Sequence, residues 1–125
     1  MYWTMILAAG IAALMHTLFF MMESVLWTKP AVMKIFRQSE SDAEITKLLA
    51  FNQGFYNLFL ALGNLIGLWL IFTKREGIGY TVIASNCAIM LGAAIILLVS
   101  SPKSLRGVIL QGLPPLVFFA ALVLS

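Results

Sequence analysis

The sequence predicts an all-α fold: an integral membrane bundle of four transmembrane helices that forms a single membrane domain over residues 1–125. Apolar residues make up 62% of the chain and charged residues 10%. A soluble domain has about 25% charged residues, so lipid rather than water must surround most of this chain. The apolar residues also form four runs, each long enough to cross a hydrocarbon layer of about 30 Å.

The four runs give approximate boundaries for the spans. The predicted helices cover residues 3–27, 42–72, 78–99 and 102–124, and a polar loop covers residues 28–41. Trp3 and Trp27 flank the first helix, and indole rings are typical of the two membrane interfaces. Within the loop, apolar positions alternate with Lys34 and Arg37 at helical spacing, which predicts a short helix on the membrane surface.

Local signals mark where helices begin and where they pack. Residues 41–44 read Ser-Asp-Ala-Glu, a capping box that predicts the start of the second helix. Ser101 followed by Pro102 predicts an N-cap and a first helical residue for the fourth helix. Gly63 and Gly67, four residues apart, predict a flat patch where another helix can approach closely.

The basic residues predict the topology. Six of the eight Lys and Arg residues lie in or beside the first and third connections, whereas the second connection holds Lys74 and Arg75. Because cytoplasmic loops carry more Lys and Arg, the expected topology is a multi-pass protein of the cell membrane with both termini outside. The basic residues flank apolar runs and form no basic surface, so no nucleic-acid partner is expected.

The functional prediction is based on the polar side chains inside the spans. Placing a charged side chain at mid-membrane costs roughly 2.5–3.5 kcal/mol, so such residues are expected to have a partner or a function. His16 and Glu23 lie two helical turns apart, on one face of a continuous first helix. Counted from the helix ends, most of the polar groups lie in the cytoplasmic half, which predicts a polar pocket open to that leaflet. The other polar members are Asn52, Gln53, Tyr56, Asn57 and Gln111, the last just before Pro114 and Pro115.

Two interpretations of these residues remain open. In the first, Glu23 is a catalytic acid or base, His16 is its partner or proton shuttle, and Trp27 with the five other polar residues orients a ligand. In the second, the amides and the phenol are hydrogen-bond glue between helices, worth about 0.6 kcal/mol each. Glu23 would then pair with Lys47 or Arg106 at the interface.

Common catalytic and metal-binding patterns are missing. The single histidine and the single cysteine, Cys87, fall on different predicted helices and make a poor zinc set. The only aspartate, Asp42, lies at the loop end, and no glycine-rich phosphate loop follows a strand. The sequence therefore predicts no metal site and no cofactor, and Cys87 is expected to be a small buried hydrophobic residue.

Several of these residues also fit a family pattern. The chain resembles the DUF1304 family of small bacterial membrane proteins, and the Asn-Gln-Gly-x-Tyr-Asn element at residues 52–57 is the most specific part of the match. The resemblance implies a four-helix membrane protein without an assigned activity. It points to Glu23, Trp27, Asn52, Gln53, Gly54, Tyr56, Asn57, Gln111 and Pro114.

Three functions are compatible with the sequence. The first is an intramembrane pocket for a lipophilic or amphipathic small molecule, with or without acid–base chemistry. The second is a small-solute transporter or resistance factor, and the third is a structural accessory subunit of the membrane. The expected partners are membrane lipid, such a small molecule and a second copy of the chain in a homodimer, which Gly63 and Gly67 would permit.

Overall fold

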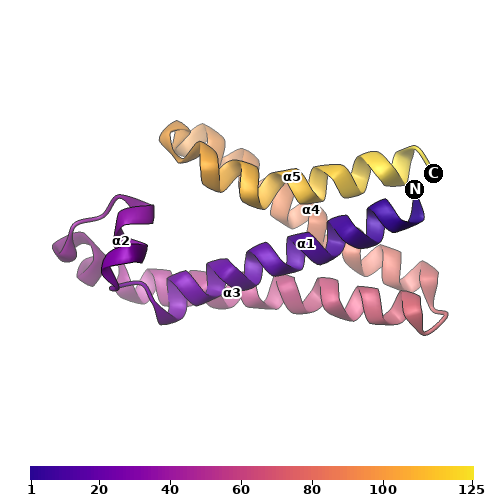
Figure 1. Ribbon diagram of the computed structural model, residues 1–125, viewed down its shortest axis with the longest axis horizontal. Coiled ribbons are helices and arrows are strands. Elements are labelled where there is room, and N and C mark those ends of the chain that lie inside the picture. The colour runs from indigo at the N-terminus through magenta and orange to yellow at the C-terminus, as the bar shows by residue number, and fades with distance from the viewer. The chain divides into compact units, whose positions relative to one another are not determined.

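The computed structural model describes all residues 1–125 and contains helices without strands (Figure 1). Four helical segments are long and apolar enough to cross a membrane, which confirms the predicted all-α membrane fold. The spans are Tyr2–Val25, Glu40–Phe72, Glu76–Ser100 and Pro102–Val123. Each end lies within two residues of its predicted boundary.

Five α-helices and two short turns make up these spans and the first connection. They are α1 (Tyr2–Phe20), a π turn (Met21–Val25), α2 (Pro30–Phe36), α3 (Glu40–Phe72), α4 (Glu76–Ser100), a 3₁₀ turn (Pro102–Ser104) and α5 (Leu105–Val123). The chain divides into two compact units. Unit 1 contains Met1–Met15 and Leu60–Ser125, and unit 2 contains His16–Phe59.

The core of unit 1 is built from side chains of α1, α3, α4 and α5. Ala8 and Ala9 of α1 meet Ile83 and Cys87 of α4 and Phe118 of α5, and each of these five side chains is less than a tenth exposed. Cys87 is completely buried, as expected for a small hydrophobic residue. Small residues on α1 let the neighbouring helices come close, which is the usual way of packing helices in lipid.

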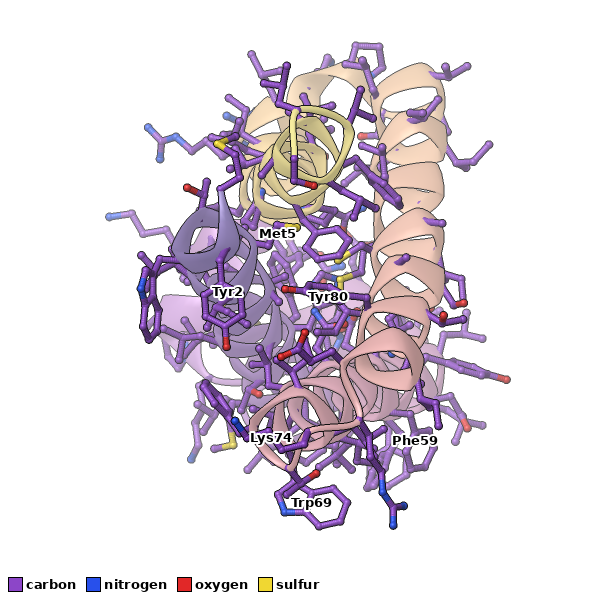
Figure 2. All side chains as sticks on the ribbon, turned by 90° about the vertical axis from the view of Figure 1, so that its right-hand side faces the viewer. Tyr2, Met5, Phe59, Trp69, Lys74 and Tyr80 are labelled. Atoms are coloured by element: carbon purple, nitrogen blue, oxygen red, sulfur yellow. The ribbon has the colours of Figure 1, made fainter.

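The outward side of unit 1 is apolar. Trp69 projects away from the ribbon in Figure 2 and is 60% exposed, whereas Met5 and Tyr80 lie between the helices. Water would disfavour so large an exposed apolar surface, whereas lipid tails accept it. The burial pattern of unit 1 is therefore that of a membrane protein.

Glycines set the closest approach between α3 and α4. A Cβ at Gly79 would lie 2.6 Å from the carbonyl oxygen of Gly67, too close for any real side chain. A Cβ at Gly63 would overlap the side-chain amide of Asn86. The predicted helix-approach patch at Gly63 and Gly67 is thus confirmed, and α4 is the helix that uses it.

The chain passes up and down through unit 1. Figure 1 shows both termini at one end of this unit, together with the turn between α3 and α4, and the connection between α4 and α5 at the other end. An even number of antiparallel spans brings the C-terminus back to the end where the N-terminus lies. Both termini therefore lie at the same end of unit 1.

The start of the fourth span differs from the prediction. Pro102 opens a 3₁₀ turn rather than α5 itself, which begins at Leu105. The Ser101 hydroxyl bonds the Ser104 hydroxyl at 2.9 Å and does not cap the helix backbone. Proline fits the first position of either kind of helix, because no backbone N–H is required there, so the sequence does not separate the two.

Unit 2 contains the predicted surface helix. α2 begins at Pro30, where a missing N–H is harmless, and ends where Arg37 adopts a left-handed conformation with φ of 55°. The backbone N–H of Gln38 then bonds the Met33 carbonyl at 2.9 Å, which satisfies an acceptor at the helix end. The prediction of a short helix inside the loop is confirmed.

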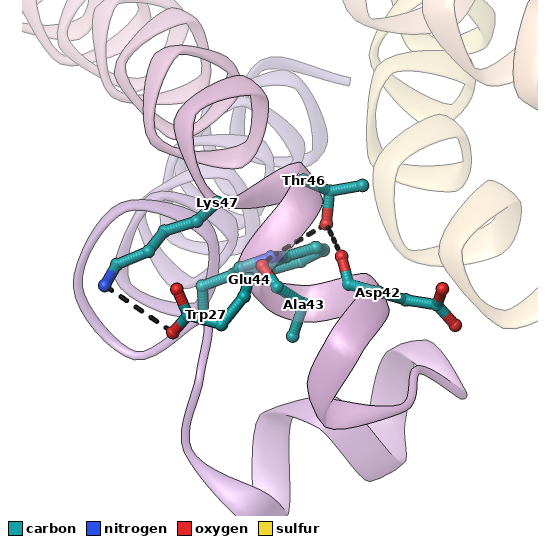
Figure 3. Close-up of polar contacts among 6 residues, drawn as sticks. All are labelled: Trp27, Asp42, Ala43, Glu44, Thr46 and Lys47. Atoms are coloured by element: carbon teal, nitrogen blue, oxygen red, sulfur yellow. Dashed lines mark hydrogen bonds and ion pairs between the residues drawn. The ribbon is translucent and has the colours of Figure 1, made fainter.

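Trp27 has a different environment from the one predicted for an interface residue. Its ring is 9% exposed, lies 4.8 Å from the Phe36 ring and packs with Val32. The indole N–H points at the carbonyl oxygen of Ala43, 3.1 Å away, and at the Thr46 hydroxyl, 3.2 Å away (Figure 3). The first connection folds back over the ring, so protein atoms rather than lipid headgroups satisfy the donor.

The predicted capping box at Ser41 and Glu44 is wrong by two residues. α3 begins at Glu40, and the hydroxyl of Ser39 accepts the backbone N–H of Asp42 at 3.1 Å. Ser39 and Asp42 have the spacing of Ser41 and Glu44, so the same motif occurs twice in overlapping frames. Glu44 instead pairs with Lys47 at 3.8 Å (Figure 3).

Candidate functional site

The end of the first span is a π turn, not a continuation of the α-helix. The backbone N–H of Leu26 bonds the carbonyl of Met21 at 2.9 Å, five residues back. Such a turn holds one extra residue, and π turns occur frequently at functional sites. The predicted single stripe of His16 and Glu23 assumed an unbroken α-helix, which this turn does not provide.

Glu23 lies on the π turn and contacts α3. Its Oε2 accepts a hydrogen bond of 2.6 Å from the side-chain amide of Asn57, which is 34 residues away in sequence and 7% exposed. No donor of the protein reaches Oε1 of Glu23, and the side chain is only half-buried. The carboxyl group therefore has one oxygen held by the protein and one open to another molecule.

Ser24 and Gly54 fix the distance between the π turn and α3. The Ser24 hydroxyl donates to the carbonyl of Phe51 at 2.7 Å. A Cβ at Gly54 would lie 2.9 Å from the backbone nitrogen of Ser24 and would overlap its hydroxyl oxygen. Because Gly54 lies one turn before Asn57, this close approach sets the spacing that lets Asn57 reach Glu23.

Aromatic rings cover the same contact between the two segments. The ring of Phe20 meets that of Phe55 edge to face, with centroids 5.2 Å apart, and the ring of Phe51 lies 5.0 Å from that of Phe55 with the planes tilted by 54°. Phe20 lies one turn before Glu23, and Phe55 lies two residues before Asn57. The two segments that carry the carboxyl–amide pair therefore also meet through aromatic rings.

The remaining predicted site residues have no described hydrogen bond to Glu23 or Asn57 and are found in other surroundings. His16 is 2% exposed and meets Phe19 edge to face at 5.7 Å, and Trp27 belongs to the core of unit 2. The others are Asn52, which is exposed and bonds its own helix at Leu48; Gln53 and Tyr56, both exposed; and Gln111, half-buried on α5 in unit 1. Among these described contacts, Glu23 and Asn57 are the two predicted site residues that touch.

The alternative pairing of Glu23 with Lys47 is not found. Lys47 pairs with Glu44 in the one ion pair of the structure. The partner of Glu23 is a neutral amide, which does not cancel the carboxylate charge. Ser24, Phe20 and Phe55 were missed by sequence reasoning, although the adjacency of Ser24 to Glu23 is a signal that could have indicated it.

A second polar cluster lies in unit 1 and fits the role of hydrogen-bond glue. Asn64 is completely buried, and its amide donates to the carbonyl of Ala9 at 3.1 Å and contacts the Cys87 sulfur at 3.9 Å. It therefore links α1, α3 and α4. Its side-chain oxygen has no hydrogen-bond partner, which is the cost of placing an amide at this three-helix contact.

The fold and the site define a class: a multi-pass helical membrane protein with a carboxyl–amide pair inside a span. The chain belongs to the DUF1304 family, described as proteins of unknown function, which it matches over residues 10–123. The match confirms the family resemblance read from the sequence. No curated protein and no solved structure shows significant similarity to the chain.

Proposed function

We propose that this protein binds the polar group of a lipophilic or amphipathic small molecule inside the membrane, with Glu23 as the contacting residue. The observation that carries the proposal is the half-satisfied carboxyl group: Oε2 is held by Asn57, whereas Oε1 has no donor from the protein. A carboxylate within a membrane span is costly unless it is paired. A bound molecule that donates to Oε1 would reduce that cost.

The surroundings support a ligand with an apolar body. The rings of Phe20 and Phe55 meet in the contact between the first span and α3, the two segments that also hold Glu23 and Asn57, so these segments offer aromatic surface to an apolar body. Membrane lipid and lipophilic small molecules share this combination of a polar group and an apolar body. In the acid–base form of the proposal, Glu23 itself exchanges a proton with the ligand.

Native mass spectrometry of the purified protein tests the proposal. Glu23→Gln keeps the size of the side chain but removes its charge, and hydrogen bonds to charged groups contribute about 1.5–3 kcal/mol. The co-purified small molecule should therefore bind roughly 10- to 100-fold more weakly. Glu44→Gln removes a carboxyl that contacts only Lys47 at the protein surface and should leave binding unchanged. Equal adduct levels in both variants would contradict the proposal.

We further propose that the protein resides in the inner membrane of bacteria with both termini outside the cytoplasm. The support is the excess of basic residues in the first and third connections, at Lys29, Lys34, Arg37, Lys103 and Arg106, with Lys47 close by. Cysteines introduced at Lys74 and Lys103 should react with an impermeant thiol reagent in intact cells at position 74 only. Labelling at position 103 instead would reverse the proposed orientation.

A further inference from the structure

An apolar groove runs between α4 and α5 in unit 1. It has a volume of about 230 Å³, and its nine lining residues, within positions 91–98 of α4 and 108–116 of α5, are aliphatic or glycine. At its floor the helices nearly touch, since a Cβ at Gly112 would lie 2.8 Å from the Cβ of Ala94. The rise of an α-helix gives the groove a length of roughly 10 Å.

Two basic residues lie at the end of the groove that is nearest the α4–α5 connection. Lys103 is in the 3₁₀ turn and Arg106 is in the first turn of α5, and both are exposed. Arg106 precedes Ile109 and Leu113, two groove residues, by three and seven positions, so it shares their helical stripe. The groove thus leads from apolar surface to a positively charged mouth.

No acidic residue of unit 1 lies at this end of the groove. The one ion pair in the structure joins Lys47 to Glu44 in unit 2, and the one acidic residue of unit 1 is Glu76, in the first turn of α4. The α4–α5 connection is at the opposite end of α4 from Glu76. Within unit 1, no acidic side chain therefore compensates the two positive charges of Lys103 and Arg106, and neither residue forms an ion pair.

We propose that this groove binds an anionic phospholipid, with one acyl chain between α4 and α5 and the phosphate group at Lys103 and Arg106. A phospholipid is complementary to the groove: its acyl chain matches the apolar lining, and its anionic headgroup matches the two basic residues at the end. Arginine forms two parallel hydrogen bonds to a phosphate group, and basic residues beside membrane helices bind anionic lipid headgroups. This site is independent of Glu23 and of the ligand proposed for it.

The charges favour lipid over a second copy of the chain as the occupant. Two copies in one membrane share their orientation, so a two-fold dimer through this face would place residues of equal depth opposite each other. Lys103 and Arg106 of both copies would then gather at one interface. Four like charges would repel, whereas an anionic headgroup is attracted.

The first test compares lipids and charge variants by native mass spectrometry. The wild-type protein in detergent should bind dioleoyl phosphatidylglycerol at least tenfold more tightly than dioleoyl phosphatidylcholine, which has identical acyl chains. Each basic residue near a membrane surface contributes about 1 kcal/mol to anionic lipid binding, so Lys103→Gln with Arg106→Gln should weaken phosphatidylglycerol binding on the order of 30-fold.

The control removes two charges from the other end of α4. Lys74→Gln with Arg75→Gln alters the α3–α4 turn, where Lys74 lies (Figure 2), and should leave the lipid affinity within about twofold of wild type. Equal weakening by both double variants would show non-specific attraction and overturn the proposal. Equal affinity of the wild-type protein for the two lipids would overturn it without reference to any variant.

A second test examines the groove itself. Ile95 lines the groove, whereas its exposed neighbour Ile96 does not. Ile95→Trp should fill the groove and weaken phosphatidylglycerol binding at least fivefold, and Ile96→Trp should bind as the wild type does. If the two tryptophan variants bind phosphatidylglycerol equally, no acyl chain occupies the groove. The same conclusion holds if the wild-type protein forms lipid-free dimers and Ile95→Trp converts them to monomers.

Discussion

Trp27→Ala is expected to destabilise unit 2 by about 3–5 kcal/mol, the range for removing a buried aromatic side chain. The indole ring lies at the centre of the contact between α2 and α3, and its N–H is the donor to Ala43 and Thr46. Alanine would leave a cavity and an acceptor without its partner. The melting temperature in detergent, followed by circular dichroism, should fall by several degrees.

Trp69→Ala is the matched control for Trp27→Ala. Trp69 is 60% exposed, is located in unit 1 and projects away from the helices. Its removal takes away lipid or detergent contacts but creates no cavity, so the melting temperature should change little. If both variants melt alike, Trp27 is not a core residue and the folded-back first connection is incorrect.

Gly54→Val is expected to separate the π turn from α3 and to break the contact between Glu23 and Asn57. Any side chain at Gly54 meets both the hydroxyl and the backbone nitrogen of Ser24. Overpacking of this kind costs typically about 1–3 kcal/mol, and here the backbone cannot move aside as a flexible side chain would. Both the melting temperature and the binding of the co-purified molecule should fall.

Gly92→Val provides the comparison on another helix. No atom beyond the neighbouring backbone of its own helix lies within 4 Å of a Cβ built at Gly92, which is exposed on α4, so valine fits without displacement. Its stability should stay near that of the wild type, since the β-branched residue replaces a poor helix former. Ligand loss in Gly54→Val together with an unchanged melting temperature would locate the effect at the site itself. Unchanged stability and binding would contradict the close approach.

The four spans could be predicted from the sequence because they depend on hydropathy alone, and each boundary agrees within two residues. The buried side of α3 could not be found from its polar residues. Asn52, Gln53 and Tyr56 are exposed, whereas Asn57 is buried on a stripe with Ala50 and Gly54. In lipid, small residues mark the packed face of a helix better than polar residues do.

The contact between Glu23 and Asn57 could not be predicted from the sequence. Glu23 and Asn57 were both predicted as site residues, but their contact depends on the π turn at Met21–Val25. A single hydrogen bond from residue i to residue i−5 does not change the hydrophobic pattern of the sequence. A helical wheel therefore treats the segment as a continuous α-helix. Trp27 was predicted to lie at the membrane interface because it ends an apolar run. Its burial could not be predicted, because it depends on α2 and α3 packing against the indole ring.

We propose that Glu23 offers its free oxygen, Oε1, to a bound molecule inside the membrane. A high-resolution crystal structure of the wild-type protein, grown in a lipid mesophase without added ligand, tests it most directly. We expect non-protein density within hydrogen-bond distance of Oε1 of Glu23, while Oε2 remains bonded to Asn57. A protein donor on Oε1, with no density beside the carboxyl group, would contradict it.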